Sequence, residues 1–350
     1  MTEDEKYISR CLQLASNGLC NAAPNPMVGA VIVHNDTIIG EGYHAICGQA
    51  HAEVNAIRSV SDESLLKEST IYVSLEPCSH HGKTPPCADL IISKGIPRVV
   101  VGCMDPFSLV AGRGIKRLRE HGIEVKVGVL EDECRQLIER FITFNTKERP
   151  YITLKWAQSA DGFIDRLRNG GEATVLSDEL TGQLVHKRRA EHSAILVGRK
   201  TALLDNPSLT TRHWYGKNPV RLVIDRNLSL PDNLKLFDHS TPTLVFTAGS
   251  KEALENLEYI TLDFSVDILP QILRTLYERK LQSLLVEGGS TLLQSFIDHH
   301  LYDEIYIEHA DICLNEGVEA PVLPHDIAMK HETYNGKTIS HYRAYSIGNI

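Results

Sequence analysis

Short apolar runs alternate with segments of helical spacing through the first 145 residues of the chain. This alternation predicts strands at 28–33, 37–39, 71–75, 98–101 and 125–129, and helices at 7–15, 88–94, 114–120 and 131–144. Short strands separated by helices are typical of a largely parallel sheet covered by helices. We therefore expect an α/β domain in this part of the chain.

A second α/β pattern follows the charged segment Lys147-Glu148-Arg149-Pro150. It predicts strands at 152–157, 194–197, 220–224, 243–247, 283–286 and 304–308, and helices at 179–191 and 291–297. The second half does not repeat the first, and 350 residues exceed the usual size of one domain. We expect two different α/β domains, residues 1–146 and 147–350.

Composition argues against a nucleic-acid-binding protein. The formal net charge is −9 and only 6% of the residues are aromatic, whereas surfaces that bind nucleic acid are basic and, for single strands, rich in aromatic side chains. No basic and apolar leader opens the chain, and no run of about 18 apolar residues could span a bilayer. We expect a cytoplasmic protein whose eight cysteines are thiols or metal ligands rather than disulfides.

A spaced set of His, Glu and Cys residues carries the chemistry of the first domain. His51-Ala52-Glu53 is followed by Glu76-Pro77-Cys78 and then by Pro86-Cys87. In zinc deaminases this order provides one His and two Cys as ligands and a Glu that transfers protons without binding the metal. We predict one Zn²⁺ per chain, bound by His51, Cys78 and Cys87, with Glu53 as the catalytic residue.

This ligand set has a physical rationale. Three protein ligands leave the fourth tetrahedral position of zinc open for a water whose pKa the metal lowers toward neutrality. The activated water would attack an amino-bearing ring carbon, while Glu53 moves its proton to the ring nitrogen and to the departing ammonia. Core packing is the alternative for any one of these residues, and a purely structural zinc site would leave Glu53 without a role.

The eight residues between the two cysteines form a polar, proline-rich segment, Ser79-His80-His81-Gly82-Lys83-Thr84-Pro85-Pro86. Zinc deaminases more commonly have two residues there. We interpret the segment as a phosphate-binding loop in which His80, Lys83 and Thr84 donate hydrogen bonds. The alternative makes His80 or His81 an additional metal ligand.

Two other segments offer substrate-binding groups. Prolines on both sides of Asn25 rigidify the chain and leave its amide able to donate and accept at a ring edge. Arg113 lies between two glycines ahead of a helix, where an anion can bind. A plain turn and a solvated loop arginine are the respective alternatives.

The second domain contains two junctions suited to a dinucleotide. Strand 194–197 runs into Gly198-Arg199-Lys200-Thr201, and strand 283–286 runs into Glu287-Gly288-Gly289-Ser290-Thr291. Glycines and cations at the start of a helix can bind phosphates through backbone N–H groups and positive charge. The G-x-G-x-x-G pattern is absent, and an ordinary tight turn is the alternative for each junction.

These motifs resemble those of one family. Asn25-Pro26 with Val28-Gly29, His51-Ala52-Glu53-Val54 and the run from Glu76 to Cys87 resemble the bifunctional deaminase/reductase of bacterial riboflavin biosynthesis (RibD type). The resemblance covers nearly the whole chain. It implies an N-terminal cytidine-deaminase-like three-layer domain followed by a C-terminal dihydrofolate-reductase-like α/β domain.

The same resemblance implies two reactions on one small molecule. The substrate would be 2,5-diamino-6-(5-phosphoribosylamino)pyrimidin-4(3H)-one, which water deaminates. The ribosyl group of the product, 5-amino-6-(5-phosphoribosylamino)uracil, would then be reduced to ribityl with NADPH. We further expect a homo-oligomer, either a dimer or a tetramer, and no nucleic-acid or membrane partner.

The resemblance also implies site residues in the second domain. It assigns to the cofactor Ala157, Val175, Gly198, Arg199, Thr201, Asp205, Gly288, Gly289, Ser290 and Thr291. It assigns to the reductase substrate Lys155, Ala173, Arg189, Leu209, Arg212 and Glu287. Arg189 and Arg212 suit the ribose phosphate, because a guanidinium group binds phosphate through two hydrogen bonds.

Two positions differ from the usual pattern of this family. Val175 stands where the family usually has Trp, and Arg226 stands where a Ser is common. They leave open an alternative in which the chain is only a deaminase, with a second domain that has lost reductase activity.

Overall fold

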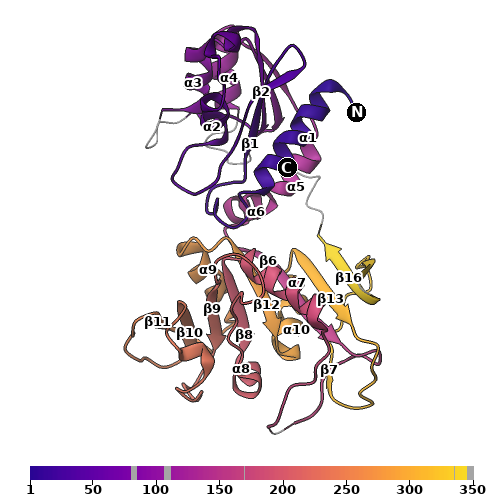
Figure 1. Cartoon of the computed structure of the whole chain (residues 1–350). Coiled ribbons are helices and arrows are strands. Elements are labelled where there is room, and N and C mark those ends of the chain that lie inside the picture. The colour runs from indigo at the N-terminus through magenta and orange to yellow at the C-terminus, as the bar shows by residue number, and fades with distance from the viewer. Residues whose placement is uncertain (80–84, 106–111, 169, 335, 345–350) are drawn as a thin grey trace. The chain divides into compact units, whose positions relative to one another are not determined.

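The computed structural model describes residues 1–79, 85–105, 112–168, 170–334 and 336–344. The chain forms two compact units, Met1–Glu148 and Arg149–Ile350 (Figure 1). The first ends just after α6 (Glu139–Lys147), and the predicted limit between residues 146 and 147 falls in the last turn of this helix. Among the described helices, none is long and apolar enough to cross a membrane.

The first unit is built on a mixed sheet of five strands in the order β2-β1-β3-β4-β5. The strands are β1 (Gly29–His34), β2 (Thr37–Tyr43), β3 (Thr70–Leu75), β4 (Arg98–Cys103) and β5 (Glu124–Val127). β3, β4 and β5 are parallel, but β1 is antiparallel to both of its neighbours. The expectation of a largely parallel sheet is therefore wrong for β1 and β2. Asn35 and Asp36 both have positive φ angles, 44° and 60°, and the resulting two-residue turn folds β2 directly back on β1.

Helices cover both faces of this sheet (Figure 1). One face packs against α1 (Glu3–Ser16) and α5 (Glu131–Leu137), and the other against α2 (Ala52–Arg58), α3 (Cys87–Lys94) and α4 (Arg113–Glu120). Alternate residues of β1 point to opposite faces, so that Ala30 and Ile32 join the core under α2 while Val31 and Val33 join the core under α1. The expected three-layer arrangement of the first domain is confirmed.

The helix predicted over 131–144 is two helices. α5 ends at Leu137 and α6 begins at Glu139, because Ile138 between them leaves helical geometry with φ −103° and ψ 18°. A short 3-10 helix, η1 (Glu63–Glu68), precedes β3.

The second unit contains a nine-stranded sheet in the order β11-β10-β9-β8-β12-β6-β13-β16-β15. The strands are β6 (Tyr151–Gln158), β8 (Ala194–Gly198), β9 (Val220–Ile224), β10 (Thr243–Thr247), β11 (Leu257–Thr261), β12 (Ser283–Gly288), β13 (Glu304–His309), β15 (Lys330–Tyr334) and β16 (Lys337–Arg343). The strands from β11 to β13 are parallel, and β16 and β15 continue the sheet antiparallel. Two short strands, β7 (Phe163–Asp165) and β14 (Val318–Glu319), pair with each other.

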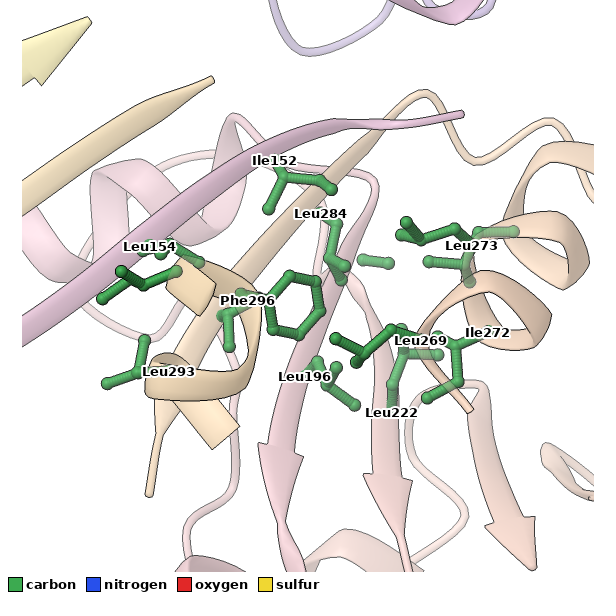
Figure 2. Close-up of a cluster of buried hydrophobic side chains, with 14 of the residues drawn as sticks. Ile152, Leu154, Leu196, Leu222, Leu269, Ile272, Leu273, Leu284, Leu293 and Phe296 are labelled. Atoms are coloured by element: carbon green, nitrogen blue, oxygen red, sulfur yellow. The ribbon is translucent and has the colours of Figure 1, made fainter. Parts of the chain in front are cut away.

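Apolar side chains fill both faces of the large sheet. The helices of this unit are α7 (Glu179–Ala190), α8 (Arg199–Asp205), α9 (Leu269–Glu278) and α10 (Ser290–Asp298). Figure 2 shows Leu196, Leu222 and Leu284 of the sheet packed with Leu273 of α9 and Phe296 of α10. Each such side chain contributes roughly 1.5–3 kcal/mol when it leaves water.

The sequence pattern did not predict β15 and β16. All five residues of β15 are exposed, so this strand has no apolar alternation to reveal it. It forms because its backbone pairs with β16, which in turn pairs with β13. The expected dihydrofolate-reductase-like α/β fold of this unit is confirmed.

Candidate functional site

Three elements of the first unit bring the predicted zinc ligands together. His51 is the residue before the first turn of α2, Cys78 follows the carboxyl end of β3, and Cys87 is the first residue of α3. The ligand atoms of all three residues lie within 4.8 Å of one another. Among the described residues, this is the one group of three or more His, Cys, Asp and Glu side chains that could hold a metal ion.

The distances fit a tetrahedral zinc ion. His51 Nδ1 lies 3.6 Å from Cys78 Sγ and 3.4 Å from Cys87 Sγ. Zinc bonds of about 2.3 Å to sulfur and about 2.0 Å to nitrogen, at a tetrahedral angle, separate the two ligand atoms by roughly 3.5 Å. The donor set and its spacing therefore suit Zn²⁺.

Hydrogen bonds favour the thiolate form of Cys78. The Cys87 backbone N–H donates to Cys78 Sγ at 3.3 Å. Hydrogen bonding from the Cys87 thiol, and then from His51, lowers the pKa of Cys78 to about 4. A bound metal would take both sulfurs as thiolates, because only the deprotonated form ligates.

Glu53 lies beside this cluster in the first turn of α2 and is only 3% exposed. Burial raises the pKa of its carboxyl to about 7, and the negative charge of Cys78 acts in the same direction. A carboxyl that titrates near neutrality can both accept and release a proton during turnover.

A cavity of about 450 Å³ opens beside the cluster. Its polar walls are formed by Asn25, His44, His51, Glu53, Glu76, Cys78, Asp105 and Asn145. Asn25 is thus placed as predicted, whereas Arg113 begins α4 and is not among the described residues of the wall. His80, Lys83 and Thr84 lie outside the described residues.

His44 fixes the orientation of Asn25. His44 Nδ1 lies 3.1 Å from the Ala50 carbonyl oxygen, which can only accept, so Nδ1 carries the proton. Nε2 then accepts from the Asn25 side-chain amide, 3.1 Å away. Burial lowers the pKa of His44 and keeps the ring neutral. The Asn25 amide oxygen is left as the acceptor of that side chain.

Sequence reasoning gave no role to Glu76, although it adjoins the Pro77-Cys78 motif. Its buried carboxylate accepts backbone N–H groups from Asp105, Gly112, Gly114 and Ile115 at 2.9–3.3 Å. Glu76 therefore ties the start of α4 to the cavity wall. Phe141 of α6 also lines the cavity, and no local motif signals it.

A cleft of about 920 Å³ occupies the second unit. Most of the residues predicted for its cofactor and substrate line this cleft: Lys155, Ala157, Ala173, Val175, Gly198, Arg199, Thr201, Asp205, Glu287, Gly288, Gly289, Ser290 and Thr291. Both predicted junctions meet there, at the carboxyl ends of β8 and β12. A side chain at Gly288 would lie 2.8 Å from Thr201, so only glycine allows this approach.

The other predicted substrate residues lie outside the cleft wall. Arg189 of α7 forms a buried ion pair with Glu287, with Nη2 2.6 Å from Oε2. Leu209 is buried and has a positive φ of 50°. Arg212 is exposed and donates to Thr210 Oγ1.

Asp205 has a partner that the sequence did not suggest. Arg168, which also lines the cleft, forms ion pairs with Asp205 and with Asp165. The contact joins the segment after β7 to the end of α8. No local motif indicates it, because the pairing depends on the fold.

The sequence matches two family profiles. Residues 1–103 match the cytidine and deoxycytidylate deaminase zinc-binding region, and residues 150–335 match the RibD C-terminal domain. The two profiles fall in the two units, one in each.

Relatives that match about 90% of the chain span both of these regions. The chain is 41% identical over 323 residues to the riboflavin biosynthesis protein RibD of Aquifex aeolicus, covering 90% of this chain and 89% of the relative. It is 39% identical to RibD of Bacillus amyloliquefaciens, covering 91% and 87%.

A solved structure is similar over almost the entire length. The diaminohydroxyphosphoribosylaminopyrimidine deaminase/5-amino-6-(5-phosphoribosylamino)uracil reductase of Thermotoga maritima matches with a TM-score of 0.89 and 39% identity, covering 98% of this chain and 99% of the other. With the His51, Cys78 and Cys87 cluster and the two folds, these matches confirm the family resemblance read from the sequence. The chain belongs to the RibD family of riboflavin biosynthesis proteins, which join a zinc-dependent deaminase to a reductase.

Proposed function

We propose that this chain deaminates 2,5-diamino-6-(5-phosphoribosylamino)pyrimidin-4(3H)-one and then reduces the ribosyl group of the product with NADPH. The observation that carries the proposal is the zinc-type cluster with buried Glu53 at the wall of a 450 Å³ cavity. A cavity of this size is within the range of small-molecule sites. The Thermotoga relative is described by the same two reactions.

For the first reaction, His51, Cys78 and Cys87 would hold the zinc ion. Bound zinc would supply a water acidic enough to attack near neutral pH. Glu53 would carry one proton of that water to the ring nitrogen, and then the proton of the newly formed hydroxyl group to the leaving amine. The Asn25 oxygen would accept a hydrogen bond from an N–H group of the pyrimidine, because one N–H of its amide nitrogen already donates to His44 and fixes the orientation of the amide.

The phosphoribosyl group would extend from this cavity. His80, Lys83 and Thr84 are proposed to bind its phosphate, with Arg113 as a further cation. This assignment is supported by the composition of the loop, which holds two His, a Lys and a Thr beside the metal ligand Cys78.

For the second reaction, the cleft of the second unit would bind NADPH and the deaminated product. The Gly198–Thr201 and Gly288–Thr291 junctions would hold the cofactor phosphates, with Ala157, Val175 and Asp205 also contacting the cofactor. NADPH supplies the hydride. Lys155, Ala173, Arg189, Leu209, Arg212 and Glu287 are proposed to position the substrate.

The test is to supply the diaminopyrimidine substrate with NADPH and to follow ammonia and NADPH together. We expect one NADPH oxidised for each ammonia released. Removing zinc with a chelator should stop ammonia release, and adding the deaminated intermediate should then restore NADPH oxidation. Ammonia release without NADPH oxidation would instead support the deaminase-only alternative, which Val175 keeps open.

The expected cytoplasmic location and the expected dimer or tetramer stay predictions. Light scattering of the purified chain tests the oligomeric state, and cell fractionation tests the location.

A further inference from the structure

Three neighbouring strands of the second unit carry charged side chains at the cleft wall or directly behind it. In the sheet, β6 lies between β12 and β13. Lys155 of β6 pairs with Tyr306 of β13, and Ala157 pairs with Glu308. Lys155 and Ala157 are two residues apart on β6, so their side chains share a face of the sheet. Glu308, which pairs with Ala157, therefore lies on the same face as Lys155.

The two carboxylates near Lys155 have different partners. Glu287 accepts three hydrogen bonds from Arg189, at 2.6–3.2 Å, so its charge is balanced by a guanidinium group. Glu308 pairs with Lys155 itself, whose Nζ lies 3.9 Å from Oε2. Glu308 is 4% exposed, and a buried carboxylate requires a compensating charge.

Glu308 is also oriented by a hydroxyl group. Ser177, which lines the cleft, donates to Glu308 Oε2 at 2.6 Å. Within the described part of the chain, the other oxygen, Oε1, is buried and has no hydrogen-bond partner. Nζ of Lys155 carries three N–H donors, so one can reach toward this carboxylate while others remain for a ligand in the cleft.

We propose that Glu308, oriented by Ser177, is a positioning residue that keeps Lys155 protonated and available as a hydrogen-bond donor at the cleft wall. The proposal rests on the proposed reductase function of this cleft. It adds to the site a residue that contacts the cleft only through its neighbours.

The charges around Lys155 support this role. Burial lowers the pKa of Lys155, and Arg188 and Arg189 of α7 lower it further. Glu287 and Glu308 raise the pKa of Lys155 and are the two carboxylates that oppose this effect. Because Glu287 is already paired with Arg189, the loss of Glu308 would leave Lys155 without an ion-pair partner of its own.

The direct test measures the charge of Lys155 without requiring turnover. Lys155 is labelled with trace acetic anhydride at a series of pH values, and the labelled peptide is quantified by mass spectrometry. In Glu308→Gln we expect about tenfold more neutral Lys155 amine at a given pH, the size of effect that a lost neighbouring charge produces. In Glu308→Asp, which keeps the charge, the titration should return toward that of the wild type.

A matched control lies on the same strand. Glu304 is equally buried but contacts Tyr306 and His341 instead of Lys155. Glu304→Gln should leave the Lys155 titration unchanged. An unchanged titration in Glu308→Gln, or an equal shift in Glu304→Gln, would overturn the proposal.

Activity gives a second and separate readout. With the deaminated intermediate and NADPH, the alkaline loss of kcat/KM should begin at lower pH in Glu308→Gln than in the wild type. If the wild-type chain oxidises no NADPH, the proposed reductase function fails, while the labelling experiment still decides whether Glu308 controls Lys155. A shifted titration with an unshifted pH profile would contradict the role of Glu308 in the reaction.

Discussion

The carboxylate of Glu76 accepts the backbone N–H of Gly114 at 2.9 Å, on the wall of the deaminase cavity. The same carboxylate holds the N–H groups of Asp105, Gly112 and Ile115. One side chain therefore fixes two segments that the sequence separates from it by about thirty residues or more. A carboxylate with four donors is suited to this task because it has about four acceptor sites.

Replacing this carboxylate should loosen the wall. In Glu76→Gln, the amide NH₂ would face backbone N–H donors and at least two hydrogen bonds would be lost, at about 1–3 kcal/mol for each buried group left unpaired. We expect lower thermal stability and reduced deamination, with NADPH oxidation on the deaminated intermediate retained. Glu120→Gln, at an exposed i,i+4 pair with Lys116, is the control and should change neither. Full deamination in Glu76→Gln would contradict the positioning role.

Gly114 also packs closely against the backbone of Pro77. A Cβ at this position would lie 2.0 Å from the Pro77 carbonyl oxygen, a distance that no relaxation of a side chain can relieve. Gly114→Ala should therefore displace α4 from Pro77 and lower the denaturation midpoint. Gly182→Ala is the control, because its methyl group would lie in open space and should be tolerated. Gly122 is not used as the control because it has a positive φ. Equal denaturation midpoints for Gly114→Ala and Gly182→Ala would show that the close approach to Pro77 does not determine stability.

The proposed proton-transfer role of Glu53 should be separable from metal binding. Glu53→Gln keeps the shape of the side chain but cannot carry the proton, so deamination should fall by roughly 10²–10⁴-fold. Zinc content, measured by mass spectrometry of the metal, should stay at one ion per chain. Cys87→Ser serves as the contrasting variant and should lose the metal. Loss of zinc from Glu53→Gln would instead mean that Glu53 supports the metal site.

Substitutions that break the ion pair between Arg189 and Glu287 should lower the stability of the second unit. Arg189→Met would leave the Glu287 carboxylate buried without its counter-charge, at a cost of about 3–5 kcal/mol. Arg189→Lys retains one charge but loses the two-pronged geometry, so we expect smaller destabilisation and a raised KM for the phosphorylated substrate. Arg274→Met, in an exposed i,i+4 pair on α9, should have little effect. Denaturant unfolding and steady-state kinetics distinguish these outcomes.

We expect the second unit to lose stability in acid because of His186. Burial, with the charge of Arg189 next, lowers the pKa of His186 to about 4. Between about pH 6.5, the ordinary value for an unfolded histidine, and about pH 4, the unfolded chain binds a proton that the folded chain does not. The free energy of unfolding should therefore fall as the pH falls through this window. His186→Asn should weaken this dependence, and an unchanged slope of stability against pH would rule out the assignment.

The clustering of His51, Cys78 and Cys87 beside Glu53 could be predicted because zinc deaminase chemistry demands particular residue types in short motifs. His51 and Glu53 are neighbours on one turn, and Cys78 adjoins a strand end that apolar patterning already reveals. His44 and Phe141 could not be predicted, since their place at the cavity depends on how the chain returns to the site. The same holds for Arg168 beside Asp205.

The order and direction of the strands in the two sheets were harder to predict from the sequence than the positions of the strands along the chain. Most strands of the second unit were located within a few residues, because their buried faces are continuously apolar. The antiparallel pairing of β1 with β2 depends on the positive φ angles of Asn35 and Asp36, which apolar patterning does not reveal. β15 carries no apolar signal at all.

The position of β6 between β12 and β13 affects how the chain can fold during synthesis. Tyr151 pairs with Ser283, and Gln158 pairs with His309, so the first strand of the second unit finds its neighbours only when much later segments have left the ribosome. The first unit pairs all of its strands within residues 29–127. A nascent chain can thus complete the zinc-binding half while β6 still has two open edges, and slow translation would prolong that exposure.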